Sequence, residues 1–174
     1  MSAKSNTLVV ISHPTLEKSK IHTAIISVAQ DRGFDIHHID QHCDPNGGFD
    51  VRSEQELLEK YDTIILQFPL YWYTVPAILK QYLDEVLTSD WAYDLRHALQ
   101  GKTFAIVVTT AGGEVDYSHT GDVKFTLDEL MAPLKATASF TRMTWGEPLY
   151  LYGVAEPTQE TINSALTRVL ARFE

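Results

Sequence analysis

Short continuous apolar runs alternate along the chain with longer stretches whose apolar residues recur every three or four positions. The runs are rich in β-branched and aromatic residues and lie at 8–11, 63–68, 103–109 and 149–152, while Phe34, Ile36 and the residues to Ile39 form a shorter segment of mixed polarity that also fits a strand. A continuous β-branched run is typical of a strand that is buried on both faces of a parallel sheet. The pattern therefore predicts five strands.

The stretches between the runs predict helices. Their apolar positions follow helical spacing, which indicates an amphipathic helix in each of four places, 21–29, 78–87, 127–134 and 162–173, the last with Phe173 on its apolar face. Ser53-x-x-Glu56 and Thr126-x-x-Glu129 have the form of capping boxes at helix starts. Pro133 is expected to bend the helix that contains it.

The order of these elements predicts the architecture. Strands and helices alternate from end to end, and the sequence contains no repeat and no linker. Such an order favours an α/β fold with a doubly wound, five-stranded parallel sheet and helices on both faces. We expect one domain that spans residues 1–174.

Composition narrows the range of functions. The chain has 174 residues and a formal net charge of −9, which disfavours a broad nucleic-acid interface because that requires clustered positive charge. Cys43 is the only cysteine, so no disulfide can form within the chain and a reducing compartment is expected. Neither a signal peptide nor an apolar run of membrane-spanning length is present. These features predict a cytoplasmic protein.

Ligands of doubly wound sheets bind beyond the carboxyl ends of the strands. The loop after the first strand, residues 12–20, contains His13, Ser19 and two lysines ahead of a helix. This arrangement fits an anion site at the helix start, and it fits an ordinary helix cap equally well. Neither G-x-G-x-x-G after a strand nor the P-loop motif is present, which disfavours a Rossmann dinucleotide site and a P-loop nucleotidase.

Two further loops carry unusual residues. After the third strand, Tyr71, Trp72 and Tyr73 stand between Pro69 and Pro76. These aromatics suit packing against a flat ring, although a core or interface plug would use the same residue types. After the fourth strand, residues 109–113 contain two glycines, which allow either a close approach of the backbone to a ligand or a simple turn.

Taken together, the three loops resemble the NAD(P)H:quinone oxidoreductase family. The resemblance is carried by His13-Pro14-x-x-x-x-Ser19, by the block QFPLYWYTVPAILK at 67–80, and by Thr109-Thr110-Ala111-Gly112-Gly113 with Tyr117. It extends along nearly the whole chain. In size the sequence is most similar to short bacterial members, among them the ancillary proteins of glutathione-regulated potassium-efflux systems. The resemblance implies a flavodoxin-like fold.

The resemblance also implies a flavin site. It assigns the phosphate end to His13, Ser19 and Ile21, with His22 where an asparagine is usual. It assigns the face of the ring to Pro69, Leu70, Tyr71, Trp72 and Tyr73. It assigns the pyrimidine side to Thr109, Ala111, Gly112 and Gly113, where Ala111 replaces a common glycine. FMN is favoured over FAD because longer relatives that use FAD have a C-terminal region absent from this sequence.

The implied activity is two-electron, ping-pong transfer of a hydride from NADH or NADPH to a quinone-type acceptor. Tyr117 and His119 are the candidates that stabilise the charge developing on the reduced ring. Family members place a histidine further beyond the tyrosine, in a longer loop. The resemblance further implies a homodimer in which Trp91 and Tyr93 form a substrate wall across the subunit interface. A local hydrophobic plug is the other interpretation of these two residues.

Other functions remain to be weighed. The chief alternative is a regulatory flavin-binding subunit of a potassium-efflux antiporter, peripheral at the inner face of the membrane, with little turnover. A one-electron flavodoxin carrier fits the aromatic block and Tyr117 less well.

The histidines after the second strand are not predicted to bind a metal. The spacing of His37-His38-x-x-x-His42-Cys43 is not that of a tetrahedral metal site, and adjacent strand residues point to opposite faces. Adjacency of Ser12 and His13 is not the geometry of a hydrolase triad.

Overall fold

The computed structural model describes residues 6–172 and contains one parallel sheet. Its strands are β1 (Thr7–Ile11), β2 (Asp35–His38), β3 (Thr63–Pro69), β4 (Thr103–Thr109), β5 (Thr144–Trp145) and β6 (Leu149–Leu151). The strand order is β2-β1-β3-β4-β5, and β6 also pairs with β4. Two short strands therefore share the last position of a five-position sheet, whose order reverses between β1 and β3. That reversal is the switch point at which doubly wound sheets bind ligands.

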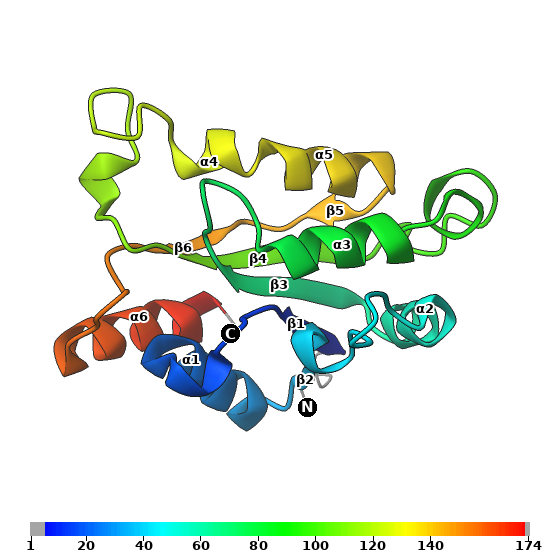
Figure 1. The fold of residues 1–174 in the computed structure, drawn as a ribbon, viewed down its shortest axis with the longest axis horizontal. Helices are drawn as coiled ribbons and strands as arrows, with labels where there is room; N and C mark the ends of the chain where they lie inside the picture. Colours follow the sequence, from blue (N-terminus) through cyan, green and yellow to red (C-terminus); the bar gives the residue numbers. More distant parts are fainter. Residues whose placement is uncertain (1–5, 173–174) are drawn as a thin grey trace.

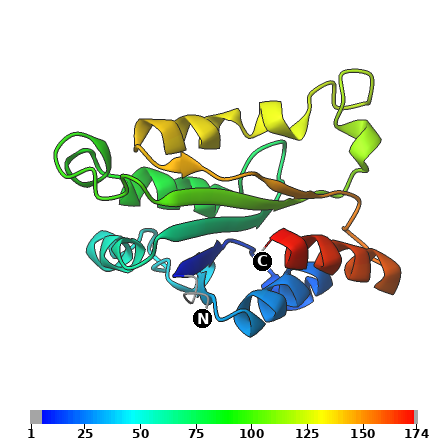
Figure 2. The same cartoon turned by 180° about the vertical axis from the view of Figure 1, so that it is seen from behind.

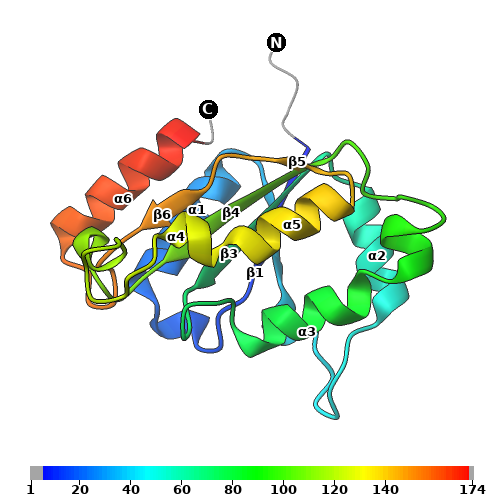
Figure 3. The ribbon, with the colours of Figure 1, turned by 90° about the horizontal axis from the view of Figure 1, so that it is seen from above.

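Helices cover both faces of the sheet. One face carries α2 (Val51–Glu59), α3 (Ala77–Val86), α4 (Leu127–Leu130) and α5 (Ala132–Phe140), and the other carries α1 (Lys20–Asp31) and α6 (Gln159–Arg172) (Figures 1 and 2). Seen from above, α4 and α5 cross in front of the strands while α1 is partly hidden behind them (Figure 3). Short helical segments follow several strands and α3, namely η1 (Leu16–Lys18), η2 (Ile39–Gln41), η3 (Ser89–Tyr93) and η4 (Glu114–Asp116). The flavodoxin-like architecture expected from the sequence is confirmed.

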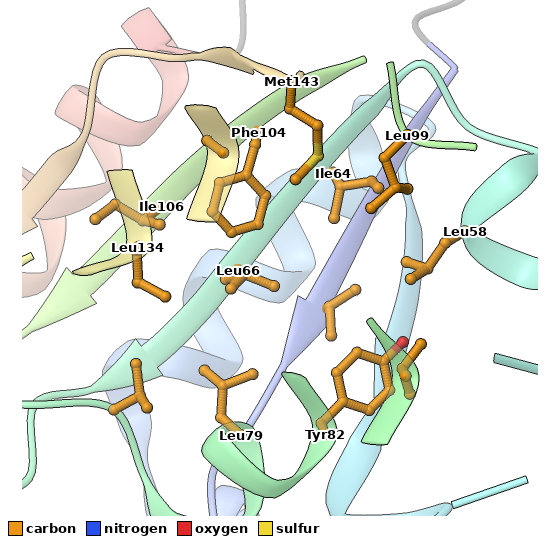
Figure 4. Close-up of a cluster of buried hydrophobic side chains, with 14 of the residues drawn as sticks. Leu58, Ile64, Leu66, Leu79, Tyr82, Leu99, Phe104, Ile106, Leu134 and Met143 are labelled. Carbon is orange, nitrogen blue, oxygen red and sulfur yellow. The ribbon is translucent and has the colours of Figure 1, made fainter. Parts of the chain in front are cut away.

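Each face of the sheet has its own hydrophobic core. Leu66, Leu79 and Leu134 belong to the cluster between the sheet and α3 and α5, shown in Figure 4. Val9, Ile25 and Val169 belong to the cluster beneath α1 and α6. β1 is buried at all five positions, which explains why its sequence is a continuous apolar run rather than an alternating one. A strand buried on both faces fixes the loops at its carboxyl end relative to both helical layers.

The structure corrects several local expectations. The N-cap of α2 is Asp50, whose carboxylate accepts from the Ser53 N–H at 3.2 Å, so the capping box predicted at Ser53 is wrong. The capping box at Thr126 is confirmed. The helix expected to bend at Pro133 is divided at Met131 into α4 and α5. Phe173, predicted on the apolar face of the last helix, lies outside the described residues. β5 has only two residues, too few for a recognisable apolar run.

Within residues 6–172, no helix has the length and apolar character needed to cross a membrane.

Candidate functional site

Four loops meet at the carboxyl ends of β1, β3, β4 and β6 and enclose a cavity of about 250 Å³. Nine of its lining residues were predicted from the sequence, namely His13, Ser19, Ile21, His22, Pro69, Leu70, Tyr71, Thr109 and Ala111. Thr15 and Lys18 of the predicted anion-site loop and Thr110 of the third loop also line it, and the structure adds Val154 and Ala155. The predicted phosphate loop, aromatic loop and glycine loop therefore contribute to one cavity, which lies at the switch point of the sheet.

One end of the cavity is suited to an anion. Ser19 is the N-cap of α1, and its Oγ accepts from the His22 N–H at 3.3 Å. The first N–H groups of a helix have no partner within the helix, and the helix dipole favours negative charge beside them. Lys18 and Thr15 line the cavity at this helix start. Backbone dipoles and one lysine thus supply positive potential in a chain whose net charge is −9.

His13 is held in a defined tautomer beside this helix start. Its Nδ1 accepts from the Thr15 N–H at 3.2 Å, so a neutral ring has its proton on Nε2. Burial lowers the pKa of His13, an effect that the nearby Asp40 opposes. The main chain of His13 is also fixed, since its N–H donates to Asp40 Oδ2 at 3.1 Å. His13 therefore offers a neutral N–H donor from a rigid loop.

His22 does not have the role that the resemblance implied. Its ring is buried, with Nε2 2.8 Å from Thr109 Oγ1 and Nδ1 3.0 Å from Gln67 Nε2. Burial, with a further contribution from His13, lowers the pKa of His22 to about 3. Because both ring nitrogens have partners inside the protein, the imidazole is not free to donate to a phosphate. It instead connects α1 to β3 and β4 beneath the cavity.

Two buried polar atoms near this network have no hydrogen-bond partner in the described part of the chain, Ser12 Oγ and Gln67 Oε1. Both residues are fully buried at the carboxyl ends of β1 and β3. Buried polar atoms without a partner are costly and concentrate at functional sites. Two polar atoms without partners thus lie close to His22, which lines the cavity.

The glycine loop has a more constrained geometry than the sequence suggested. The Gly113 N–H donates to Asp116 Oδ2 at 2.7 Å, so this N–H is not free for a ligand. A Cβ at Gly112 would lie 2.9 Å from the same oxygen and 3.3 Å from the Tyr117 ring. A side chain at 112 would therefore displace the Asp116 carboxylate and press on the Tyr117 ring. Ala111 is the residue of this loop that lines the cavity beside Thr109 and Thr110.

Tyr117 lies beside the cavity rather than in its wall. Its ring centroid is 5.8 Å from that of Tyr152, and burial raises its pKa. The hydroxyl therefore stays protonated at neutral pH and can donate a hydrogen bond. Tyr117 remains a candidate for stabilising negative charge on a bound ring.

His119 is not placed for that role. Its Nε2 lies 3.0 Å from both carboxylate oxygens of Glu129, on the exposed surface. Glu129 is already held by the Thr126 backbone in the capping box of α4, and those hydrogen bonds together with His119 lower the pKa of Glu129 to about 2. His119 thus anchors the loop after η4 to α4, because a fixed carboxylate lies within its reach. We remove His119 from the candidate catalytic residues.

Gly121 is a further constraint in this loop that sequence reasoning missed. A Cβ at this position would lie 2.2 Å from the Val115 carbonyl oxygen and 2.5 Å from that of Asp116. The loop therefore closes on itself behind Tyr117, and only glycine fits. A single glycine in a polar stretch gives no signal of such a close approach.

The aromatic loop is a tight hairpin with unusual backbone angles. Tyr71 and Thr74 exchange two backbone hydrogen bonds of 3.0 Å, and the two residues between them, Trp72 and Tyr73, have φ of 45° and 66°. Side chains with a Cβ are disfavoured in this region by about 1–2 kcal/mol per residue. Trp72 is 90% exposed, while Tyr71 and Tyr73 are about half exposed. The turn therefore holds aromatic rings out beyond the cavity at a cost in stability, which is typical of functional loops.

Replacing Trp72 by glycine tests this interpretation. We expect Trp72→Gly to leave the free energy of unfolding within about 1 kcal/mol of the wild type, because glycine relieves the positive φ and little buried surface is lost. The control is Trp91→Ala, which removes a ring that is 2% exposed and should cost about 3–5 kcal/mol. Urea unfolding of both variants measures the difference. A loss of several kcal/mol in Trp72→Gly would show that the ring is a core residue.

The substrate wall expected from Trp91 and Tyr93 is not supported for Trp91. Trp91 belongs to the core beneath α3 and α5, and its Nε1 donates to Glu59 Oε1 at 2.6 Å. Tyr93 lies nearer the surface, with its ring centroid 4.9 Å from that of Phe140. Trp91 is therefore the local plug that the sequence allowed as an alternative. Tyr93 lines a different, larger groove between α3 and α5.

The loop after β6 is the part of the cavity that sequence reasoning overlooked. Val154 and Ala155 line the cavity, and the preceding Gly153 has φ of 67°. The Gly153 N–H donates to the Gly112 carbonyl at 2.8 Å, which joins this loop to the glycine loop. The available signal was the position of the segment after a strand of the same parallel sheet, at the same edge as the other loops.

Fold and cavity together define a flavodoxin-like protein, and the chain belongs to that family, whose model matches residues 5–173. Its relatives in the family include proteins named NAD(P)H oxidoreductase and NADPH-quinone reductase, as the sequence motifs indicated. An uncharacterized NAD(P)H oxidoreductase of Bacillus subtilis (strain 168), YrkL, is 34% identical over 94% of this chain and 95% of its own length. The potassium-efflux ancillary protein KefG of Pectobacterium atrosepticum is 31% identical over 94% and 90%.

Solved structures support the same grouping. The general stress protein 14 of Treponema denticola, solved in complex with FMN, is 32% identical with a TM-score of 0.87 over 97% of both chains. An NADPH-quinone reductase from P. pentosaceus is 31% identical with a TM-score of 0.85, over 97% of this chain and 98% of that one. A protein described as a thermophilic tryptophan halogenase from Streptomycin violaceusniger is 33% identical with a TM-score of 0.88, over 95% and 96%. Structural likeness therefore identifies the family without fixing a substrate.

Proposed function

We propose that this protein is an FMN-dependent NAD(P)H oxidoreductase that reduces quinones or related flat acceptors. The observation that carries the proposal is the cavity at the switch point, which combines an anion-binding helix start with an aromatic hairpin. Relatives described as NAD(P)H oxidoreductase, as NADPH-quinone reductase and as a complex with FMN support it. A cytoplasmic location is part of the same proposal.

The residues present fit a flavin mononucleotide. The start of α1, with Lys18, Ser19 and the Nε2–H of His13, suits a phosphate. Pro69, Leu70 and Tyr71 supply an apolar wall for a ring, and Thr109 to Ala111 supply polar backbone beside it. When bound, FMN would accept a hydride from NADH or NADPH and pass the electrons to the acceptor.

The protein's own contribution is binding, orientation and charge stabilisation. The hairpin at Trp72 and Tyr73 extends the wall beyond the cavity, where a planar acceptor can pack. Tyr117 can donate a hydrogen bond to charge that develops on the ring, since its raised pKa keeps the proton on the oxygen. Trp91 and His119 take no part in this scheme.

The proposal is tested with purified protein and FMN. Binding is expected to be stoichiometric by quenching of flavin fluorescence, and oxidation of NADPH or NADH with a benzoquinone should exceed that of a free-FMN blank. The two nucleotides are compared at equal concentration to determine the preferred donor. Absence of tight binding of FMN, measured alongside FAD, would refute the flavin site.

The assay also separates the enzyme from the regulatory alternative. The similarity to KefG supports, as the second candidate function, an ancillary subunit of a potassium-efflux antiporter. Tight FMN binding with no turnover above the blank, across several quinones, would favour that role. Turnover well above the blank would favour the enzyme.

We further propose that the groove between α3 and α5 is the contact surface of a homodimer. Its volume is about 690 Å³, and it is lined mainly by apolar side chains, including Leu83, Leu87, Tyr93, Leu130 and Phe140. Phe140 is 66% exposed, and contiguous apolar surface of this kind is characteristic of protein contacts. Lys80 and Asp84, also in the groove, form an i,i+4 pair on α3. A second copy would bury the apolar part of this surface.

Replacing Phe140 by glutamate should weaken this contact. A charge placed in a desolvated apolar interface is unfavourable, so Phe140→Glu is expected to shift the molar mass from that of a dimer toward about 20 kDa, the mass of one chain. Light scattering after size exclusion measures the change. The control is Leu170→Glu on α6, on the opposite face of the sheet, which should leave the mass unchanged. A wild-type protein that is monomeric throughout would refute the dimer.

A further inference from the structure

Two histidines and a glutamate from three separate elements converge beside β2, away from the cavity. His37 lies on β2, His42 follows η2, and Glu54 lies on α2. One nitrogen of each imidazole and one carboxylate oxygen all lie within 4.8 Å of one another. These are the donor types that bind zinc and related transition metals.

The cluster has a buried base and an exposed side. His37 Nε2 and Glu54 Oε2 are 2.7 Å apart, and both side chains are largely buried. The Tyr82 hydroxyl donates to the same oxygen of Glu54 at 3.0 Å. Both hydrogen bonds go to Oε2, and in the described part of the chain no hydrogen bond is recorded for Oε1. Tyr82 therefore fixes the orientation of the Glu54 carboxylate while leaving Oε1 without a hydrogen bond in the described part of the chain. A carboxylate oriented in this way is suited to bind a metal ion.

His42 is exposed, and its ring is free to reorient. The ring lies against that of His37, with centroids 4.3 Å apart and planes inclined by 36°. Within the described residues the His42 ring makes no hydrogen bond, and the Glu54 carboxylate lies within 4.8 Å of one of its nitrogens. A tetrahedral ion with bonds of about 2.0–2.2 Å needs its ligands about 3.4 Å apart. Rotation of the His42 side chain and a small opening of the His37–Glu54 pair would meet that requirement.

We propose that His37, His42 and Glu54 form a binding site for a divalent transition-metal ion of the zinc type. Three protein ligands, two imidazole nitrogens and one carboxylate oxygen, leave a fourth position toward solvent on the side of His42. The adjacent His38 does not participate, because it lies on the opposite face of β2 and its Nε2 contacts the His13 carbonyl at 3.2 Å. The sequence spacing predicted no metal because adjacent strand histidines point to opposite faces. The proposed site differs from that expectation because it uses only one of the two adjacent histidines and takes its third ligand from α2.

The site is separate from the proposed flavin cavity. In the sheet His37 pairs with Val10, whose side chain belongs to the core beneath α3 and α5. The cavity lies at the strand ends instead, and none of the three ligands lines it. The segment between His37 and His42 does contain Asp40, which holds the His13 backbone. A bound ion would therefore tie together β2, η2 and α2 next to the phosphate loop.

Metal titration of chelator-treated protein tests the site. Isothermal calorimetry with Zn²⁺ alone is expected to show one ion bound per chain, and Co²⁺ should give the visible absorption of a four- or five-coordinate ion. His42→Ala should weaken Zn²⁺ binding at least tenfold, and because His42 is exposed this variant should fold normally, which circular dichroism verifies. His119→Ala is the matched control, since it removes an exposed histidine that pairs with a single glutamate.

The outcomes are distinct. One ion per chain, weakened by His42→Ala and unchanged within about twofold by His119→Ala, supports the site. Equal Zn²⁺ affinity in wild type and His42→Ala, or no stoichiometric binding by the wild type, overturns it. Cys43→Ser should retain the wild-type affinity for Zn²⁺. A loss of Zn²⁺ affinity in this variant would overturn the proposed ligand set in favour of one that contains the thiolate of Cys43.

Discussion

Lowering the pH from 6.5 to 5.0 is expected to reduce the free energy of unfolding by about 2 kcal/mol through His22 alone. The pKa of His22 in the folded protein is about 3, against 6.5 for an ordinary histidine. Between these values the unfolded chain binds a proton that the folded protein excludes. The stabilisation is therefore complete above pH 6.5 and is lost progressively as the pH falls. Burial of His13, which also lowers its pKa, adds to the effect.

Urea unfolding of the wild type and of His22→Asn at several pH values measures this contribution. Asparagine retains an amide that can reach Gln67 or Thr109, but it does not titrate, so the variant should lose about 2 kcal/mol less than the wild type over the same interval. Ile25→Val, on the same helix, is the control, because it lowers stability without changing a titrating group and should keep the wild-type slope. Parallel pH dependences for wild type and His22→Asn would show that the buried imidazole is not the cause.

Reversing the charge at Lys18 is expected to weaken FMN binding by about tenfold to a hundredfold. Lys18 lines the cavity beside the N-terminus of α1, and loss of a hydrogen bond to a charged group costs about 1.5–3 kcal/mol. Riboflavin has the same ring without the phosphate, so its affinity should change much less. Fluorescence titrations of Lys18→Glu with FMN and with riboflavin measure the two affinities separately.

The control for Lys18→Glu has the same change of charge far from the cavity. Lys135 is exposed on α5, on the opposite side of the sheet from α1, and Lys135→Glu should leave both affinities near those of the wild type. An equal loss of affinity for FMN and riboflavin in Lys18→Glu would place the phosphate elsewhere. That result would also remove the main support for the proposed orientation of the flavin.

The strands and helices could be predicted because burial on two faces leaves a strong pattern. The run at β1 and the spacing in α1 each follow directly from which positions face the core. β5 could not be found in this way, since two residues carry no periodicity. The start of α2 was misplaced because Asp50 and Ser53 are both common capping residues, and only the backbone geometry distinguishes them.

The candidate site was predictable to the extent that it follows from loop position. Residues directly after strands, such as His13 and Ala111, lie where a parallel sheet must place them. Side chains that depend on distant partners were not predictable: Glu129 holds His119, and Glu59 holds Trp91. The convergence of His37 with Glu54 depends in the same way on how α2 packs beside β2. Sequence spacing carries no information about such contacts between elements.

The division of the last sheet position into β5 and β6 has a consequence for how copies of the chain behave in concentrated solution. An exposed edge strand offers free N–H and C=O groups to which another chain can add a strand, and this is a common route to aggregation. Here the edge beside β4 consists of strands of two and three residues separated at 146–148, and the other edge, β2, has four residues. Neither edge presents a long regular template, so the sheet is protected against polymerisation by strand addition.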